Sequence, residues 1–417
     1  MQLKRVVVTG MGAITPLGNT LQEFWDGLVN GVSGADFITQ FDASKFKTRF
    51  ACEVKNFDPT SYLDKKEARK IDRFSQFALV VSDQAMADAG LHRDTINADR
   101  GGVVFASGIG GINTFQTEVS EYAKGDGTPR FNPFFIPKMI LDIAAGQISM
   151  RHNLRGPNFA VVSACASSTN SLMEAYNLLR LGKADFILAG GSESVICEAG
   201  VGGFNAMKAM SERNDDPKTA SRPYDKDRDG FVMGEAAGIV VLETLESALA
   251  RGARIYCEIA GAGATADAHH ITAPHPEGLG ARNVMIAALE DAGMKAEDID
   301  YINTHGTSTP LGDGAEVKAI TDVFGEHAYN LNISSTKSMT GHCLGAAGVI
   351  EAIACIESVV NDVVPPTINH FTDDPDLDPK LNFTFNKAQK RTVNAALSNT
   401  FGFGGHNACV IVKKYVA

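Results

Sequence analysis

The chain lacks the features that mark several common protein classes. Its 417 residues contain no CxxC pair, and the cysteines are odd in number and scattered, at positions 52, 165, 197, 257, 343, 355 and 409. This pattern argues against a disulfide framework and a structural zinc site and fits a reducing cytosol. No apolar run approaches the roughly 20 residues that span a bilayer. We therefore expect a cytoplasmic protein that does not insert into a membrane.

An excess of basic charge is also missing. The formal net charge is -11, which argues against a general nucleic-acid binder. One basic cluster nevertheless stands out on a predicted helix, whose opposite face is apolar from Phe74 to Ala85. The basic residues are Lys65, Lys66, Arg69, Lys70 and Arg73. A solvated face of an amphipathic helix is the common interpretation, and a docking site for an acidic partner is the alternative.

The order of strand-like and helical runs indicates an α/β fold that was duplicated in tandem. RVVVTGMGAIT near the start resembles IYCEIAGAGATA at 255–266, and FAVVSACASSTNSLMEA resembles LNISSTKSMTGHCLGAAGVIEA at 331–352. ADFILAGGSES (184–194) likewise parallels IDYINTHGTST (299–309). We predict two related units, residues 1–254 and 255–417, whose equivalent loops meet at a pseudo-twofold axis.

Three short motifs imitate ligand sites. GMGAIT (10–15) and GAGATA (261–266) resemble dinucleotide-binding fingerprints, but no clear acidic residue about 20 positions further on follows a second strand. We interpret both as tight turns at strand ends. DKDRDG (225–230) imitates a calcium loop, yet Glu235 stands one place early for its last ligand. His269 and His270 lack a third metal ligand at a suitable spacing, so we predict no metal site.

One cysteine lies where a buried strand turns into a helix, in NFAVVSACASSTNSLMEA (158–175). The small neighbours of Cys165 leave room for a substrate. A helix that begins here directs its free N–H groups and its dipole at the sulfur, which should lower the thiol pKa from about 8.5. A lone cysteine is more often a small buried residue without a chemical role, so the residues that surround Cys165 in the fold must show whether it reacts.

Two histidines and a glycine-rich loop provide those neighbours. His305 lies in NTHGTSTPLGD and His342 in STKSMTGHCLGAAG, both after strands, where ligands of open α/β sheets usually bind. Lys337 adds a cation near His342, and Glu351 is its expected carboxylate partner. Phe403 lies among three glycines in SNTFGFGGHN (398–407). That segment is either a hairpin-like turn or a mobile loop that gates a pocket and offers an N–H to an oxyanion.

Together these motifs resemble the thiolase-fold condensing enzymes, and most closely the β-ketoacyl-[acyl carrier protein] synthase II group of type II fatty acid synthesis. The resemblance covers essentially the whole chain, RPYDKDRDGFVMGEAAG included. It implies a thiolase-like α/β fold, with duplicated halves in α-β-α-β-α layers and the site between them. The first half would carry the cysteine and the second both histidines. Tyr224, where tryptophan is frequent, and His406, where threonine is common, depart from the family pattern.

The resemblance also implies a mechanism. The Cys165 thiolate attacks an acyl thioester, and the backbone N–H groups of Cys165 and Phe403 hold the oxyanion. Malonyl thioester then loses CO2, and the enolate, stabilised by His305 and His342, attacks the acyl group. Lys337, held by Glu351, orients and polarises the site. The fatty chain grows by two carbons, and the reaction needs no metal or redox cofactor.

The remaining implied residues bind substrate or partner. The pantetheine arm is expected at Thr307, Thr309 and Thr272, and Glu351 belongs to the same substrate-binding set. Ile109 and Phe204 are expected to line the acyl pocket. Acyl carrier protein is expected to dock on Lys66, Arg69, Lys70 and Lys208. The resemblance further implies a homodimer.

Four alternatives compete with this interpretation. A degradative thiolase needs a second catalytic cysteine in the C-terminal glycine-rich loop, which here carries Phe403, while Cys409 falls in the following strand. A Cys-His-Asn synthase would have asparagine in place of His342. A non-catalytic subunit that sets chain length would lack Cys165. A nucleotide-dependent oxidoreductase is the remaining alternative, and it is excluded if the protein does not bind a nicotinamide cofactor.

Overall fold

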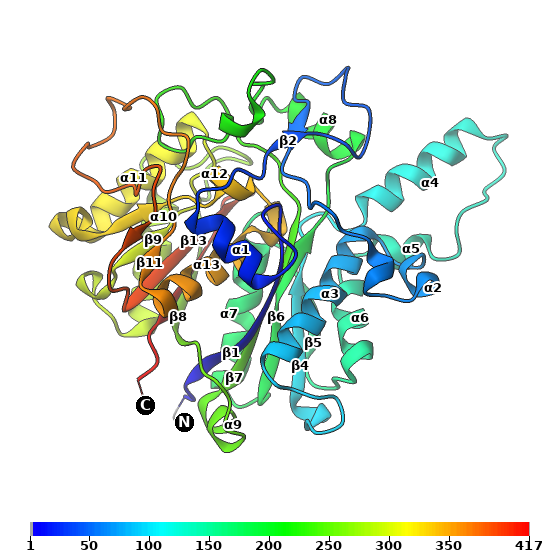
Figure 1. The fold of residues 1–417 in the computed structure, drawn as a ribbon, viewed down its shortest axis with the longest axis horizontal. Coiled ribbons are helices and arrows are strands. Elements are labelled where there is room, and N and C mark those ends of the chain that lie inside the picture. The colour runs from blue at the N-terminus through cyan, green and yellow to red at the C-terminus, as the bar shows by residue number, and fades with distance from the viewer. Residues whose placement is uncertain (1–2, 417) are drawn as a thin grey trace.

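One mixed sheet organises the fold in the computed structural model, which describes residues 3–416 (Figure 1). Its strands are β1 (Val6–Ile14), β4 (Gly101–Ala106), β5 (Asn158–Val161), β6 (Phe186–Glu193), β7 (Ala236–Thr244), β8 (Cys257–Ala266), β9 (Tyr301–Asn303), β10 (Asn332–Ser334), β13 (Ala395–Gly402) and β14 (His406–Lys413). They follow the order β10-β9-β13-β14-β8-β1-β7-β6-β4-β5. The first and second halves of the chain therefore each form one contiguous part of the sheet.

The two parts of the sheet have the same topology. The order β5-β4-β6-β7-β1 in the first half matches β10-β9-β13-β14-β8 in the second. β4 runs parallel to β5 and β6, as β9 runs parallel to β10 and β13, and the other pairs are antiparallel in both halves. β1 and β8 join the halves over residues 6–8 and 257–259. This repeat is what a tandem duplication produces, although the division between residues 254 and 255 stays a prediction.

Two of the three sequence echoes agree with this topology. β1 and β8 are equivalent, and so are the strand-turn-helix segments that begin at β5 and β10. The third pairing was wrong, because residues 184–194 form β6, the equivalent of β13, whereas residues 299–309 contain β9, the equivalent of β4. Both segments are buried strands that run into a polar loop, and that pattern alone does not distinguish positions within a sheet.

Helices form the outer and middle layers. α7 (Ser167–Arg180) and α13 (Ala347–Asn361) contact each other and strands of both halves, so they lie between the two parts of the sheet. The outer faces are covered by α3 (Arg73–Asp88), α6 (Ile143–His152), α10 (Leu279–Ala292) and α11 (Pro310–Phe324). The layers thus run α-β-α-β-α, as predicted. The stretch Leu344–Asn361 is long and apolar enough to cross a membrane, but it is 89% buried and forms a core helix.

Our interpretation of the two glycine motifs as turns was wrong. Gly10 and Gly12 lie inside β1, where a Cβ would come within 2.6 and 2.3 Å of backbone oxygens of α3. Gly261 and Gly263 lie inside β8, where a Cβ would come within 2.5 and 2.7 Å of backbone atoms of α10. The glycines let one helix pack directly on each central strand. The same device occurs in both halves.

Shorter elements surround these layers. They are α1 (Leu21–Val29), α2 (Lys65–Ala68), α4 (Ile112–Lys124), α5 (Phe135–Met139), α8 (Glu198–Ala206), α9 (Leu245–Ala250), α12 (Lys337–Thr340), and the strand pairs β2 (Asp36–Phe37) with β3 (Phe50–Ala51) and β11 (Val363–Val364) with β12 (Gln389–Lys390). The basic segment is two helices rather than one. Asp72 caps α3 by accepting from Phe74 N, and its other oxygen accepts from Thr114 N and Oγ at 2.9 and 2.6 Å. These contacts fix the start of α3, whereas α2 has already ended at Ala68.

Candidate active site

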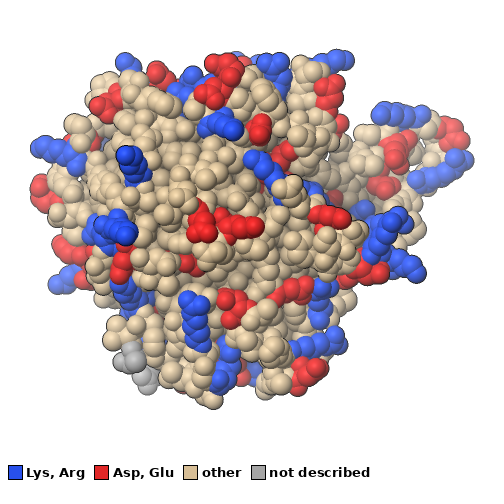
Figure 2. Space-filling model, in the orientation of Figure 1, with Lys and Arg blue, Asp and Glu red and all other residues tan. Residues whose placement is uncertain are grey.

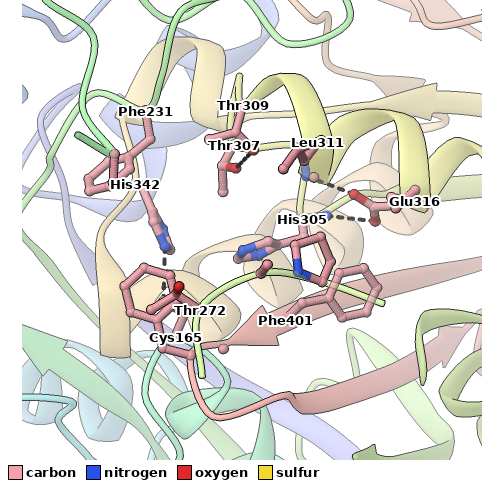
Figure 3. Close-up of a pocket in the computed structure, with 18 of the residues that line it drawn as sticks. Cys165, Phe231, Thr272, His305, Thr307, Thr309, Leu311, Glu316, His342 and Phe401 are labelled. Carbon is pink, nitrogen blue, oxygen red and sulfur yellow. Dashed lines mark hydrogen bonds between the residues drawn. The ribbon is translucent and has the colours of Figure 1, made fainter. Parts of the chain in front are cut away.

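Cys165 lies in a cavity of about 440 Å³ where loops of both halves meet (Figure 3). It occupies the turn between β5 and α7, and the preceding Ala164 has a left-handed φ of 51°. Ser167 stabilises this turn: its Oγ accepts from Ser163 N at 2.8 Å and donates to Ala164 O at 2.6 Å. Few residues other than glycine adopt such a φ. The sharp turn therefore depends on small residues and projects the thiol into the cavity.

The second half places both histidines beside this thiol. His342 Nε2 is 3.1 Å from Cys165 Sγ, and the ring centroids of His305 and His342 are 5.2 Å apart (Figure 3). The loop that carries His305 is held by Glu316 on α11, which accepts from His305 N at 2.9 Å and Gly306 N at 2.8 Å. The structure thus brings together the three residues predicted to carry the chemistry.

Burial sets the protonation of these groups. It lowers the pKa of both His305 and His342 well below the usual value, and the Lys337 charge adds to the effect, so both rings are neutral near pH 7. Our expectation of a lowered thiol pKa was wrong. Burial raises the pKa of Cys165 to about 12, against the opposing effects of Lys337 and the backbone N–H groups of Phe403 and Cys165. The thiol keeps its proton until a base accepts it, and His342 Nε2 is in hydrogen-bond contact.

Lys337 and Glu351 form a buried ion pair behind the histidines. Burial raises the pKa of Glu351 to about 7, and the Lys337 charge opposes this. Neither residue lines the cavity. The assignment of Glu351 to the substrate-binding set was therefore wrong, because its carboxylate contacts Lys337 and is shielded from the cavity. The pair acts on the histidines through the Lys337 charge.

Most of the predicted substrate residues line the cavity. Thr307 and Thr309 lie side by side with their hydroxyl oxygens 3.1 Å apart, and Thr272 lines the same cavity (Figure 3). Phe204 also lines it, next to the Phe403 ring at a centroid distance of 6.4 Å. Ile109 does not line it but, like Phe204, packs against the apolar cluster that contains Cys165. The polar arm of a substrate would thus lie along the threonines, and its apolar chain would lie along Phe204 and Ile109.

The Phe403 loop is a hairpin turn between β13 and β14, in which Gly402 pairs with His406. Gly404 and Gly405 have left-handed φ values of 89° and 76°. A Cβ on Gly402 would come within 2.7 Å of Ser163 O and 3.1 Å of the nucleophile's backbone nitrogen. Glycine is therefore required at Gly402 for close approach and at the other two positions for conformation.

Sequence reasoning missed Glu316. It lies on a helix that follows the His305 loop, and its carboxylate turns back to that loop and also accepts from Asn399 Nδ2 at 3.3 Å. Glu316 was visible in PLGDGAEV (310–317), but nothing in its spacing showed which backbone groups it would contact. No group of three or more His, Cys, Asp or Glu side chains within residues 3–416 is arranged to hold a metal ion.

Comparison with known proteins agrees with this geometry. Residues 3–248 match the family described as Beta-ketoacyl synthase, N-terminal domain, and residues 256–371 match Beta-ketoacyl synthase, C-terminal domain. The chain belongs to the β-ketoacyl synthase family. The resemblance stated from the motifs is thereby confirmed, and this family member is a condensing acyltransferase.

Its relatives match over nearly their whole length. Proteins named 3-oxoacyl-[acyl-carrier-protein] synthase 2 from Synechocystis sp. and Staphylococcus aureus (strain COL) are each 50% identical, covering 100% of this chain and 99% and 100% of theirs. Among solved structures, the ishigamide ketosynthase/chain length factor gives a TM-score of 0.92 at 34% identity, covering 99% of this chain and 100% of that one. A ketosynthase from Burkholderia phymatum gives 0.90 at 34% identity, with the same coverage. The predicted thiolase-like fold is confirmed.

Proposed function

We propose that this chain catalyses the decarboxylating condensation of malonyl-[acyl carrier protein] with an acyl group held on Cys165, lengthening a fatty acyl chain by two carbons. The observation that carries the proposal is the contact between the Cys165 thiol and the neutral imidazole of His342, with His305 beside it, in a cavity shared by both halves. The relatives named 3-oxoacyl-[acyl-carrier-protein] synthase 2 support this choice of substrate.

The first step acylates the cysteine. Cys165 Sγ forms a bond to the thioester carbonyl carbon as its proton passes to His342 Nε2, 3.1 Å away. The backbone N–H groups of Cys165 and Phe403, which already act on the sulfur, stabilise the oxyanion. The bond to the carrier thiol then breaks, and the leaving thiolate takes the proton from His342. The enzyme keeps an acyl thioester and a neutral imidazole.

The second step makes the new carbon–carbon bond. The bond between the malonyl methylene carbon and its carboxylate breaks, CO2 leaves, and the electron pair becomes an enolate on the thioester. Neutral His305 and His342 donate hydrogen bonds to that oxygen without carrying charge of their own. For His342 this step uses the tautomer with the proton on Nε2, whereas the first step uses the tautomer in which Nε2 is the free acceptor. The enolate carbon attacks the acyl carbonyl, and the bond to Cys165 Sγ breaks. The released thiolate takes a proton from solvent, which restores the resting enzyme.

The carrier protein is proposed to dock through charge. Lys66, Arg69 and Lys70 are exposed on and just after α2, where Figure 2 shows Lys and Arg side chains at the right of the view. Lys208 is exposed at the cavity mouth. Arg73 is not part of this surface, because it pairs with buried Glu235 at 3.0 Å. One structural neighbour is an acyl-carrier protein in complex with its ketosynthase, with a TM-score of 0.90 and 33% identity.

The proposal also includes a homodimer in the cytoplasm. β5 is a terminal strand of the sheet, and Phe159 within it and Val162 just after it expose 38% and 57% of their surface. Such an edge pairs readily with another strand, and a second copy of this chain offers the same edge. All seven cysteines are free and buried, as in a reducing compartment. Sedimentation at micromolar concentration should give twice the chain mass, and a monomer would contradict the proposal.

The function is tested with purified carrier substrates. The protein should acquire one acyl group on Cys165 from acyl carrier protein and release CO2 and a β-ketoacyl product when malonyl carrier is added. Cys165→Ala should abolish the acyl adduct. Cys197→Ala, a matched change at a buried cysteine outside the cavity, should preserve it. Peptide mass spectrometry locates the adduct, and acylation of another cysteine or absence of product contradicts the proposal.

A further inference from the structure

A buried carboxylate near Cys165 has no cation partner among the described residues. Glu193, at the end of β6, is fully buried. Its Oε1 accepts from Ser107 Oγ at 2.8 Å and Ile109 N at 3.2 Å, and its Oε2 accepts from Gly108 N at 2.8 Å and Gly345 N at 2.9 Å. An unpaired buried charge is costly unless such donors satisfy it. Four donors on one carboxylate therefore indicate a specific structural task.

The donors come from two parts of the active site that belong to different halves. Residues 107–109 form the loop after β4, and Gly345 follows His342 by three residues. The contact is tight, because a Cβ on Gly345 would come within 2.3 Å of Gly108 N and 2.6 Å of Glu193 Oε2. The carboxylate thus occupies the space that the two glycines leave. Neither segment can move relative to the other without losing these bonds.

We propose that Glu193 is a positioning residue of the condensation reaction. It joins the loop of residues 107–109 to the turn after His342, and it thereby fixes the path of the acyl chain and the His342 imidazole relative to Cys165. The part of this proposal that concerns acyl chains rests on the proposed function. We call the connection that Glu193 makes between residues 107–109 and Gly345 the clamp, and it rests only on the contacts of the folded chain.

The Glu193 charge also acts on the thiol. Burial is the main cause that raises the pKa of Cys165, Lys337 opposes it, and Glu193 adds to the rise. The other ionisable groups beside the thiol are the neutral rings of His342 and His305. Removing the Glu193 charge should therefore make the thiol easier to ionise, which a role in packing alone would not do.

The first test is Glu193→Gln, with alkylation of Cys165 by iodoacetamide followed by peptide mass spectrometry across a pH series. The pH dependence should move to lower pH, and the rate at pH 7 should rise roughly threefold or more. Glu243→Gln is the matched control, since Glu243 is a buried carboxylate at the opposite end of the neighbouring strand β7. It should leave the alkylation profile unchanged. An unchanged profile in Glu193→Gln, or an equal shift in both variants, overturns the proposal.

The second test is Ser107→Ala, which removes one neutral hydrogen-bond donor to Glu193 and keeps the Glu193 charge. It tests the proposal even if Glu193→Gln does not fold. It should change the ratio of turnover with long and short acyl carriers by roughly threefold to tenfold, with an alkylation profile like that of the parent. An unchanged ratio overturns the clamp. Failure of the proposed function is a different result, in which the parent enzyme forms no condensation product although its Cys165 alkylation is still measurable.

Discussion

Replacing His305 by alanine should slow malonyl decarboxylation about 10²–10³-fold and change the acylation rate of Cys165 by less than about threefold. The His305 ring lies beside His342, whereas only His342 is in hydrogen-bond contact with the sulfur. Charge on the enolate oxygen arises only in the second step, so a donor at His305 acts only there. One preorganised donor stabilises such an oxyanion by about 3–4 kcal/mol, which corresponds to the stated loss.

The contacts in the structure distinguish the expected roles of His305 and His342, which the sequence had treated alike. Because His342 Nε2 contacts Cys165 Sγ at 3.1 Å, His342→Ala should slow acylation as well as decarboxylation. Intact-mass measurement of acyl-enzyme formation gives the first rate, and CO2 release from malonyl carrier with the acylated enzyme gives the second. His327→Ala, at a histidine that bonds Ile299 O outside the cavity, controls for loss of an imidazole. A His305→Ala enzyme that decarboxylates normally but resists acylation would refute the assignment.

Three further predictions concern pH, docking and gating. The pKa values of both cavity histidines are lowered, so the rings stay neutral as pH falls through about 6.5. Decarboxylation should therefore keep its rate from pH 8 to 6, and a loss of rate centred near pH 6.5 would contradict this. Lys66→Glu combined with Lys70→Glu should raise KM for carrier substrates roughly tenfold, as added salt should, but hardly affect short thioester mimics; equal loss on both would indicate a folding defect. Phe403→Ala should raise malonyl decarboxylation without an acyl acceptor relative to condensation, and identical Phe403 positions in free and acylated crystal structures would exclude a gate.

The same histidines should make stability depend on pH. The unfolded chain takes up protons at both rings near pH 6.5, whereas the folded chain does not until lower pH, since the folded pKa values are depressed. The free energy of unfolding should therefore fall as pH drops below about 6.5. Denaturant titrations of the parent and of His305→Ala would show this, because the variant should lose less stability than the parent between pH 7 and 5.

The residues that meet in the cavity could be predicted because each lies in a contiguous motif with a local signal. Cys165 and His342 both stand among small residues at a strand-to-helix turn, and His305 stands in a polar loop after a strand. Lys337 and Glu351 were close enough in sequence to be paired on chemical grounds. The α/β class and the duplication followed from the alternation of strands and helices and from the repeated patterns, whereas the layered arrangement followed from the family resemblance.

The errors came from quantities that depend on distant contacts. The basic segment divides into α2 and α3, and Asp72, which caps α3, also accepts from Thr114, a residue 42 positions away. The thiol pKa was misjudged because a helix start is visible in sequence, whereas burial, which outweighs it at Cys165, is a property of the whole fold. The glycines of β1 and β8 looked like turns because the helix residues that contact them are more than 20 positions away along the chain.

The duplication accounts for the places of Cys165 and His342 but not for those of the two buried carboxylates. Cys165 lies between β5 and α7 and His342 lies between β10 and α13, so the thiol and the imidazole beside it come from corresponding connections of the two halves. The loops after β4 and β9 are equivalent too, and a buried carboxylate holds two backbone N–H groups of each. Glu193 holds those of residues 108 and 109, and Glu316 holds those of residues 305 and 306. The two carboxylates come from different elements, a strand end and a helix, so equivalent loops acquired the same support separately. Glu193 ties its loop to the turn after His342, whereas Glu316 ties its loop to the outer helix α11 and to Asn399 of β13.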